Sequence, residues 1–253
     1  MIGPRSTAGV KSRPPGGANP GVPIQGAGGE KPGSVLPVRG REKVDWRLMH
    51  ETPEREGVVK YTVRHVTARL VLPPEMSELF AWRRRMRELQ LIGEDAHGLG
   101  YGNLSIRLYA SPRFLITGSQ SSGLIDVDQR HFAEVSVIDL DRNSLRSKGE
   151  TPPSSEALTH AALYQTRSSI RAVVHVHSHA IWSAQKDTLP TTKPDVPYGT
   201  PEMAYEMIRL NKRHVITDTG VIVMGGHQDG VVAFGPSLAD AAGEILKLLP
   251  ART

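Results

Sequence analysis

The pattern of apolar and polar residues along the chain predicts a succession of β-strands. Alternation over 58–72 predicts a strand at the edge of a sheet, which Pro73 and Pro74 then end. Turn-forming glycine, asparagine and proline separate the later apolar runs. One further strand is therefore expected to follow a glycine-rich turn at Gly98 and to end at Leu108. Others are expected over 114–117, 134–139, 172–179, 221–224 and 231–234.

Spacings of three and four residues predict helices between these strands. Leu79, Trp82, Met86 and Leu89 mark the buried side of an amphipathic helix over 75–92. The rest of its surface is expected to face solvent and carries Arg83, Arg84, Arg85 and Arg87. Shorter helices are predicted up to about 165 after a Ser154 or Ser155 cap, over 202–210 after Thr200 and Pro201, and over 238–249 after Ser237.

Residues 1–42 differ in composition from the rest of the chain. They hold ten of the 25 glycines and seven of the 19 prolines, with almost no apolar periodicity. Such a segment cannot bury enough apolar surface to offset the entropy of ordering. We therefore expect a disordered basic tail, followed by one folded domain over 43–253. Because the tail carries +4 of the formal net charge of +5, the domain is about neutral, and nucleic-acid binding is not expected.

Cysteine is absent from all 253 residues. Its absence excludes disulfides, thiolate catalysis and cysteine-ligated zinc. No apolar run approaches the length that spans a membrane, and the N-terminus lacks the apolar segment of a secretory signal. A cytoplasmic protein with no membrane partner is the expectation.

Three histidines alternate with other residues directly after an apolar run that begins at Ala172. In a strand, alternate side chains share a face, so His175, His177 and His179 are expected to point the same way. Two imidazoles two residues apart can share a metal ion, which then needs a third ligand from elsewhere. His227, in a glycine-rich turn between two predicted strands, is the candidate. The alternative is a polar strand face whose histidines only make hydrogen bonds.

A carboxylate, Glu156, lies in the first turn of the helix that precedes these histidines. The helix dipole favours a negative charge there, so Glu156 has a structural interpretation beside a catalytic one. His160, four residues on, shares its helix face. Around residues 102, 117 and 154, glycine, serine and threonine offer N–H and hydroxyl groups that suit an anion, although such residues also dominate ordinary turns.

In their order along the chain, these motifs resemble the class II aldolase/adducin superfamily. The matching residues lie within about 75–250 and are Gly102-Asn103-x-Ser105, Thr117-Gly118, Pro153-Ser154-Ser155-Glu156, His175-x-His177 and His227. The resemblance implies an α/β fold, specifically a three-layer α/β/α sandwich with a central, mainly antiparallel sheet. It also implies a homotetramer with sites between subunits and a small-molecule substrate.

The resemblance also implies roles for individual residues. By position, His175, His177 and His227 are the expected metal ligands, and Glu156 is the expected catalytic acid and base. Phosphate or substrate binding is expected of Gly102, Asn103, Thr117, Gly118, Ser154 and Ser155, with His179 as a further substrate-side group. The expected cofactor is one divalent metal per chain, with zinc in first place and iron or manganese as alternatives.

Three functions follow as hypotheses. The first is a metal-dependent lyase of aldolase, dehydratase or epimerase type, acting on a small sugar phosphate or hydroxy-carbonyl compound through an enediolate. The second is an oxygenase that holds iron in the same three-histidine site. The third is a non-catalytic adducin-like module, against which the retained histidines and Glu156 argue. The tyrosines that aldolases of this family use are absent after the histidine pair, over 190–194, and at the C-terminus.

Overall fold

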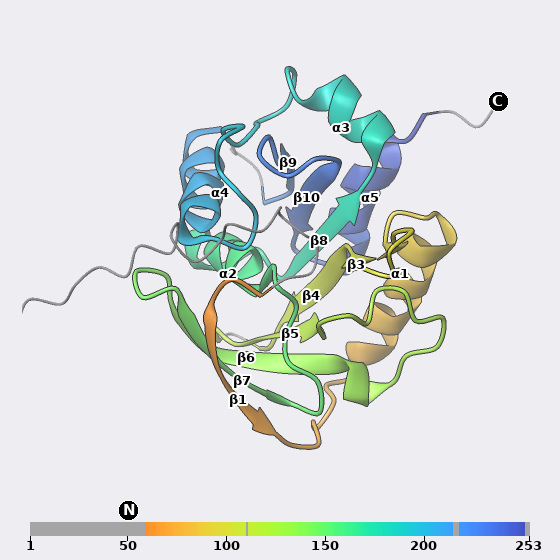
Figure 1. The fold of residues 1–253 in the computed structure, drawn as a ribbon, viewed down its shortest axis with the longest axis vertical. Coiled ribbons are helices and arrows are strands. Elements are labelled where there is room, and N and C mark those ends of the chain that lie inside the picture. The colour runs from red at the N-terminus through yellow and green to blue at the C-terminus, as the bar shows by residue number, and fades with distance from the viewer. Residues whose placement is uncertain (1–58, 110, 215–217, 251–253) are drawn as a thin grey trace, which may run out of the picture. The chain divides into compact units, whose positions relative to one another are not determined.

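A computed structural model describes residues 59–109, 111–214 and 218–250. The expected disordered tail over 1–42 lies outside the described residues, as does the beginning of the expected domain. From edge to edge, the larger sheet consists of β1 (Thr62–Thr67), β7 (Ser144–Gly149), β6 (Phe132–Asp139), β5 (Phe114–Thr117), β4 (Asn103–Arg107), β8 (Ala172–His177), β10 (Gly230–Gly235) and β9 (Gly220–Val223). Figure 1 shows β1 at one edge of this sheet and β9 at the other.

The remaining elements are a small sheet and the helices. β2 (Gly93–Glu94) and β3 (Gly100–Tyr101) pair with each other in a separate two-stranded sheet. The helices are α1 (Met76–Glu88), α2 (Ala157–Thr166), α3 (His179–Gln185), α4 (Pro201–His214) and α5 (Leu238–Leu248), with a short 3-10 helix at Gln129–His131.

Pairing in the larger sheet is antiparallel except between β1 and β7, which run parallel. The sheet is therefore mainly antiparallel, as the sequence predicted. The strand expected within 58–72 forms as β1, and its edge position is confirmed. By contrast, β7 and α3 were not predicted.

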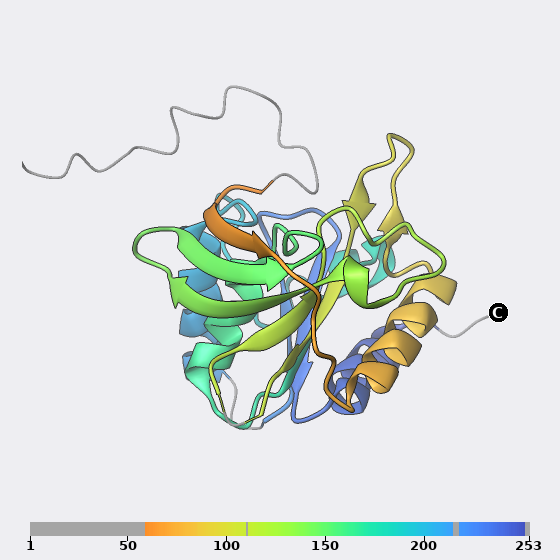
Figure 2. The ribbon, with the colours of Figure 1, turned by 90° about the horizontal axis from the view of Figure 1, so that it is seen from below.

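Helices cover both faces of the sheet. On one face, α2 and α4 share a hydrophobic core with Val173 of β8 and Val232 of β10. On the other face, α1 and α5 share a second core with Val174 and Val176 of β8. Figure 2 shows α1 in gold and α5 in blue on one side of the sheet, with α2 and α4 on the opposite side. The predicted three-layer α/β/α sandwich is confirmed.

The central strands are buried on both faces, because each face is covered by helices. β10 is buried along its whole length, and β8 along all of it except His177, which is half-buried. Such strands carry continuous apolar runs where a strand with one solvated face would alternate. The histidines of β8 are therefore exceptional, because they place polar side chains between valines in the middle of the molecule.

Candidate metal centre

The register of β8 directs two of its histidines toward α2. Val173 packs in the core under α2 and α4, whereas Val174 and Val176 pack in the core under α1 and α5. Since side chains alternate along a strand, His175 and His177 share the face of Val173. His175 is fully buried and pairs across the sheet with Asn103 on β4.

His227 reaches the same place from the turn between β9 and β10. Its backbone N–H donates to the carbonyl of Met224 at 3.2 Å, and its carbonyl accepts from Gly230 at 3.0 Å. Gly230 pairs with His177 in the sheet, so the turn lies beside the end of β8. The turn also packs closely on a neighbouring loop, because a Cβ on Gly226 would lie 2.0 Å from the carbonyl oxygen of Val196.

The three imidazoles form a compact cluster. Ring centroids are 5.1 Å apart for His175 and His177, 5.3 Å for His175 and His227, and 4.7 Å for His177 and His227. Each residue offers one donor atom, and these atoms lie within 4.8 Å of one another. Zinc–nitrogen bonds are about 2.0–2.1 Å long, so modest side-chain rotations would bring all three donors to one ion.

The hydrogen bonding of His175 suits a metal ligand. Its Nδ1 lies 3.2 Å from the carbonyl oxygen of Val231, to which it donates, and this fixes the tautomer and ring orientation. Its Nε2 is buried and has no hydrogen-bond partner among the described residues. Burial, and then the neighbouring His177, His227 and His160, hold the pKa of His175 well below its ordinary value. A neutral imidazole with a buried lone pair fits a divalent ion.

Glu156 is the carboxylate beside the cluster. Its side chain is 1% exposed, and its Oε1 lies 3.8 Å from Nδ1 of His227. The hydroxyl of Thr159 donates a short hydrogen bond to its Oε2. The expected position in the first helical turn is wrong by one residue, because α2 begins at Ala157 and Glu156 is the N-cap. Its side chain makes no capping hydrogen bond, whereas Oγ of Ser154 accepts from the Glu156 N–H at 3.3 Å.

The stretches expected to bind phosphate are brought together beside the cluster. The N–H of Ser154 donates to the Thr117 carbonyl at 3.2 Å, and Gly118 forms an isolated bridge with Pro153. Asn103 lies opposite His175, and its Oδ1 is buried without a hydrogen-bond partner among the described residues. The side chains of Asn103, Thr117, Ser154 and Ser155 are buried.

Gly102 has a clear conformational reason to be glycine. Its φ is +72°, and a Cβ there would lie 2.5 Å from Cγ2 of Ile92 and 3.1 Å from the carbonyl oxygen of His175. A side chain is therefore excluded where the chain enters β4 next to the histidine strand.

His179 does not join the cluster. The strand ends at His177, and His179 begins α3 after Ser178, whose Oγ accepts from the Ile181 N–H as a helix cap. The His179 side chain is 70% exposed, and its Nδ1 lies 2.8 Å from Oδ1 of Asp229. The expectation that three histidines share one strand face is therefore wrong, because the alternation ends with the strand.

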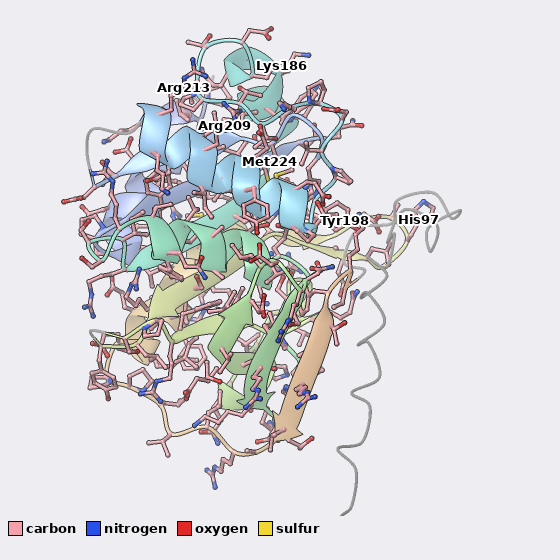
Figure 3. The ribbon with its side chains drawn as sticks, turned by 90° about the vertical axis from the view of Figure 1, so that its left-hand side faces the viewer. His97, Lys186, Tyr198, Arg209, Arg213 and Met224 are labelled. Carbon is pink, nitrogen blue, oxygen red and sulfur yellow. The ribbon has the colours of Figure 1, made fainter. Side chains whose placement is uncertain are left out.

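Two tyrosines that sequence reasoning missed adjoin the cluster. The ring of Tyr198 lies 4.5 Å from that of His227, at an interplanar angle of 30°. The ring of Tyr101, on β3, lies 5.3 Å from that of His177. Figure 3 shows Tyr198 beside the beginning of α4. The positions at which family aldolases were expected to carry tyrosines hold other residues, but two tyrosine rings from other positions lie beside the cluster.

A second buried polar group lies under α2. Oγ of Ser105 is 2.7 Å from Nδ1 of His160 and 2.7 Å from the hydroxyl of Tyr164. Burial lowers the pKa of His160 to about 3, so this imidazole is neutral. The network attaches α2 to β4 and thereby supports the helix that presents Glu156.

Comparisons with known proteins agree with this fold. Residues 86–248 match the family model described as Class II Aldolase and Adducin N-terminal domain. The 3-oxo-tetronate 4-phosphate decarboxylase of Haemophilus influenzae is 35% identical over 150 residues, covering 50% of this chain and 67% of that protein. The fold and the histidine cluster fit an enzyme of the lyase kind that uses a divalent metal. The chain belongs to the class II aldolase and adducin family.

Solved structures show the same fold. An L-fuculose 1-phosphate aldolase has a TM-score of 0.53 at 20% identity, covering 72% of this chain and 85% of that one. YgbL from Escherichia coli has a TM-score of 0.50 at 22% identity, covering 68% and 83%. Members of the family generally use a divalent metal and often form oligomers. Within the described residues, no helix has the length and apolar content needed to cross a membrane.

Proposed function

We propose that this chain is a divalent-metal-dependent lyase acting on a small sugar phosphate or hydroxy-carbonyl acid. The observation that carries the proposal is the convergence of His175, His177 and His227 beside the buried carboxylate of Glu156. Zinc is the proposed metal, with iron or manganese as alternatives, and the family's frequent oligomers support a homotetramer with sites between subunits. A cytoplasmic location completes the proposal.

The decarboxylase relative favours one reaction within this class. In a 3-oxo acid, the carbon–carbon bond to the carboxylate can break, with its electron pair forming an enolate while carbon dioxide leaves. When bound, a divalent metal would polarise the ketone oxygen and stabilise the negative charge that develops there. The enolate carbon then takes up a proton, and the product is a ketone.

Glu156 is the group proposed to handle that proton. Its carboxylate is enclosed, since Thr159 fixes one oxygen and the other lies 3.8 Å from His227. An enclosed carboxylate at this position can receive a proton from the substrate or return one to it. Tyr198 and Tyr101, whose rings adjoin those of His227 and His177, help to exclude water from the same space.

The phosphate of such a substrate is proposed to bind at Gly102, Asn103, Thr117, Gly118, Ser154 and Ser155. Of the six, Asn103 offers a side-chain amide, and Thr117, Ser154 and Ser155 offer hydroxyls. Asn103 pairs with His175 across the sheet, and Ser154 is hydrogen-bonded to Thr117. None of the six is cationic, so binding there would rely on hydrogen bonds. We expect inorganic phosphate to compete with substrate in the millimolar range, and Ser155→Ala to weaken this competition without loss of metal.

Metal analysis is the first test of the proposal. The wild type should contain about one divalent ion per chain, and His177→Ala should lose most of it, because two imidazoles remain. His179→Ala is the matched control, since this exposed histidine lies two residues away and outside the cluster. Undiminished metal in His177→Ala would contradict the ligand assignment.

Turnover assays separate the proposed lyase from the oxygenase hypothesis. The zinc-, manganese- and iron-loaded proteins should be assayed for carbon dioxide release from 3-oxo-tetronate 4-phosphate and for aldol cleavage of L-fuculose 1-phosphate. Release of either product without oxygen uptake supports the lyase. Oxygen consumption that requires iron, with neither lyase product formed, would replace it by an oxygenase.

A further inference from the structure

The segment directly before β1 contacts residues next to the metal centre, although it precedes the matched family domain, which begins at residue 86. The hydroxyl of Tyr61 donates to the carbonyls of Ser154 at 2.8 Å and Pro153 at 3.2 Å. Burial, and then the charge of Glu156, raise the pKa of Tyr61, so the hydroxyl stays protonated and keeps donating. The segment is thus attached to the loop that leads into Glu156.

Lys60, the preceding residue, places a positive charge beside the same site. Its Nζ lies 3.8 Å from the centroid of the Tyr198 ring, and that ring lies 4.5 Å from the ring of His227. A Cβ on Gly199 would lie 3.2 Å from the Ser155 carbonyl oxygen and 3.9 Å from Cδ of Lys60. The Lys60 side chain therefore lies near one end of the proposed phosphate residues.

The backbone of Lys60 is fixed while its side chain is long. The amide of Asn143 donates to the Lys60 carbonyl at 2.7 Å, which holds the main chain at the turn between β6 and β7. The four-carbon stem ends in a compact ammonium with three donors, which can turn from an aromatic face toward an anion. A fixed backbone and an ammonium group that can change position are suited to binding a charged ligand.

A cation–aromatic contact alone does not indicate a ligand. Lys186 makes a similar contact, with its Nζ 4.9 Å from the Trp182 ring centroid. The two lysines differ in location, because Figure 3 shows Lys186 at the top of the view, well away from Tyr198, and Lys186 is the C-cap residue of α3. Of these two contacts, the Lys60 contact joins a ring that in turn adjoins a candidate metal ligand, His227. Lys186 therefore serves as a matched control.

We propose that Lys60 binds an anionic group of the substrate, a phosphate or a carboxylate, beside Tyr198 and Ser155. This inference rests on the proposed function, because it names a charge that the lyase's substrate must carry. It supplies the cation that the six proposed phosphate residues lack. It also gives the segment before the family domain a role in substrate recognition.

The experiment compares Lys60→Met, which keeps side-chain length without charge, with Lys60→Arg and the control Lys186→Met. Two probes are titrated into each metal-loaded protein: glycerol 3-phosphate, which has a phosphate only, and glycolate, which has a carboxylate only. Lys60→Met should weaken binding of one probe about 10- to 100-fold, the usual loss of a charge-assisted hydrogen bond. Lys60→Arg should restore most of it, and Lys186→Met should match the wild type.

Each outcome bears on the inference. Selective weakening of glycerol 3-phosphate assigns Lys60 to a phosphate, and selective weakening of glycolate assigns it to a carboxylate. Equal binding of both probes by Lys60→Met and wild type would overturn the proposal, as would a wild type that binds neither probe. Metal content and melting temperature, unchanged in Lys60→Met, show that the site is intact. If lyase turnover is absent but Lys60→Met still weakens a probe, only the proposed reaction fails.

Discussion

Glu156 illustrates how one carboxylate can serve a helix or a reaction. Acidic residues at a helix N-terminus commonly stabilise the helix dipole, and they do so while exposed or capping. The Glu156 side chain is instead 1% exposed, makes no capping hydrogen bond and lies 3.8 Å from His227. Burial of a carboxylate away from water is unfavourable unless polar or charged groups lie beside it. The position of Glu156 next to His227 therefore argues for chemistry at the histidine cluster.

Glu156→Gln should keep the fold and the metal while turnover falls about 10²- to 10⁴-fold, the usual contribution of a general acid or base. The amide keeps the size of the side chain but cannot accept a proton. The measurements are kcat and metal content per chain. Glu202→Gln is the control, because Glu202 is an acidic residue at the beginning of another helix, α4.

Either of two results would contradict this role. Full turnover in Glu156→Gln would leave Glu156 as a charge at the beginning of a helix. Loss of metal from the variant would make Glu156 a ligand and move the acid–base role to another residue.

At the scale of elements, a buried arginine holds the loop that follows β5. Arg83 is 1% exposed and donates to the carbonyls of Ser121 and Leu124 at 2.6 Å each, and to Ser122 at 3.3 Å. The prediction that the arginines of α1 all face solvent is wrong for Arg83. Burial, and then the charge of Arg87, lower the pKa of Arg83 to about 10, so it stays charged near neutrality.

Arg83→Met should lower the free energy of unfolding by about 2–4 kcal/mol, because buried carbonyls lose their donor. Chemical denaturation measures this change. Arg84→Met, one residue along and exposed, should stay within about 0.5 kcal/mol of the wild type. Equal stability of the two variants would show that solvent satisfies the loop carbonyls.

Some elements were predictable because local pattern and tertiary structure agree. β5 forms over 114–117 as predicted, from a buried run of mostly apolar residues, and α5 begins after its predicted cap, Ser237. β7 was missed because its sequence, SLRSKG, is mostly polar. It forms through pairing with β1 and β6 on either side, which no local pattern records.

The site, too, was predictable only in part. The spacing of His175 and His177 identified a pair, and the glycine turn at His227 suggested a third ligand; the structure brings the three together. The alternating pattern of histidines could not reveal that Ser178 caps a helix, so that the strand ends before His179. Lys60 and Tyr198 carry no recognisable motif and are far apart in sequence, so only the fold makes them neighbours.

At the scale of the whole molecule, the folded unit extends beyond the matched family domain. The match covers 86–248, yet β1 and most of α1 precede it. β1 completes one edge of the sheet by pairing along its length with β7, and Tyr61 belongs to the core under α2 and α4. A chain shortened to the family match would lose that edge and part of the metal centre's surroundings.

Two N-terminal deletions separate the expected tail from the segment directly before β1. Removing residues 1–42 should leave melting temperature and metal content unchanged, because the tail offers few apolar residues to a core. Removing residues 1–61 should lower the melting temperature, since buried Tyr61 is lost, and should also weaken anion binding, since Lys60 is lost. Thermal unfolding, metal analysis and probe titration report the three quantities for both variants. A large fall in melting temperature on removal of 1–42 alone would contradict the tail assignment and indicate an arm that contacts a neighbouring subunit.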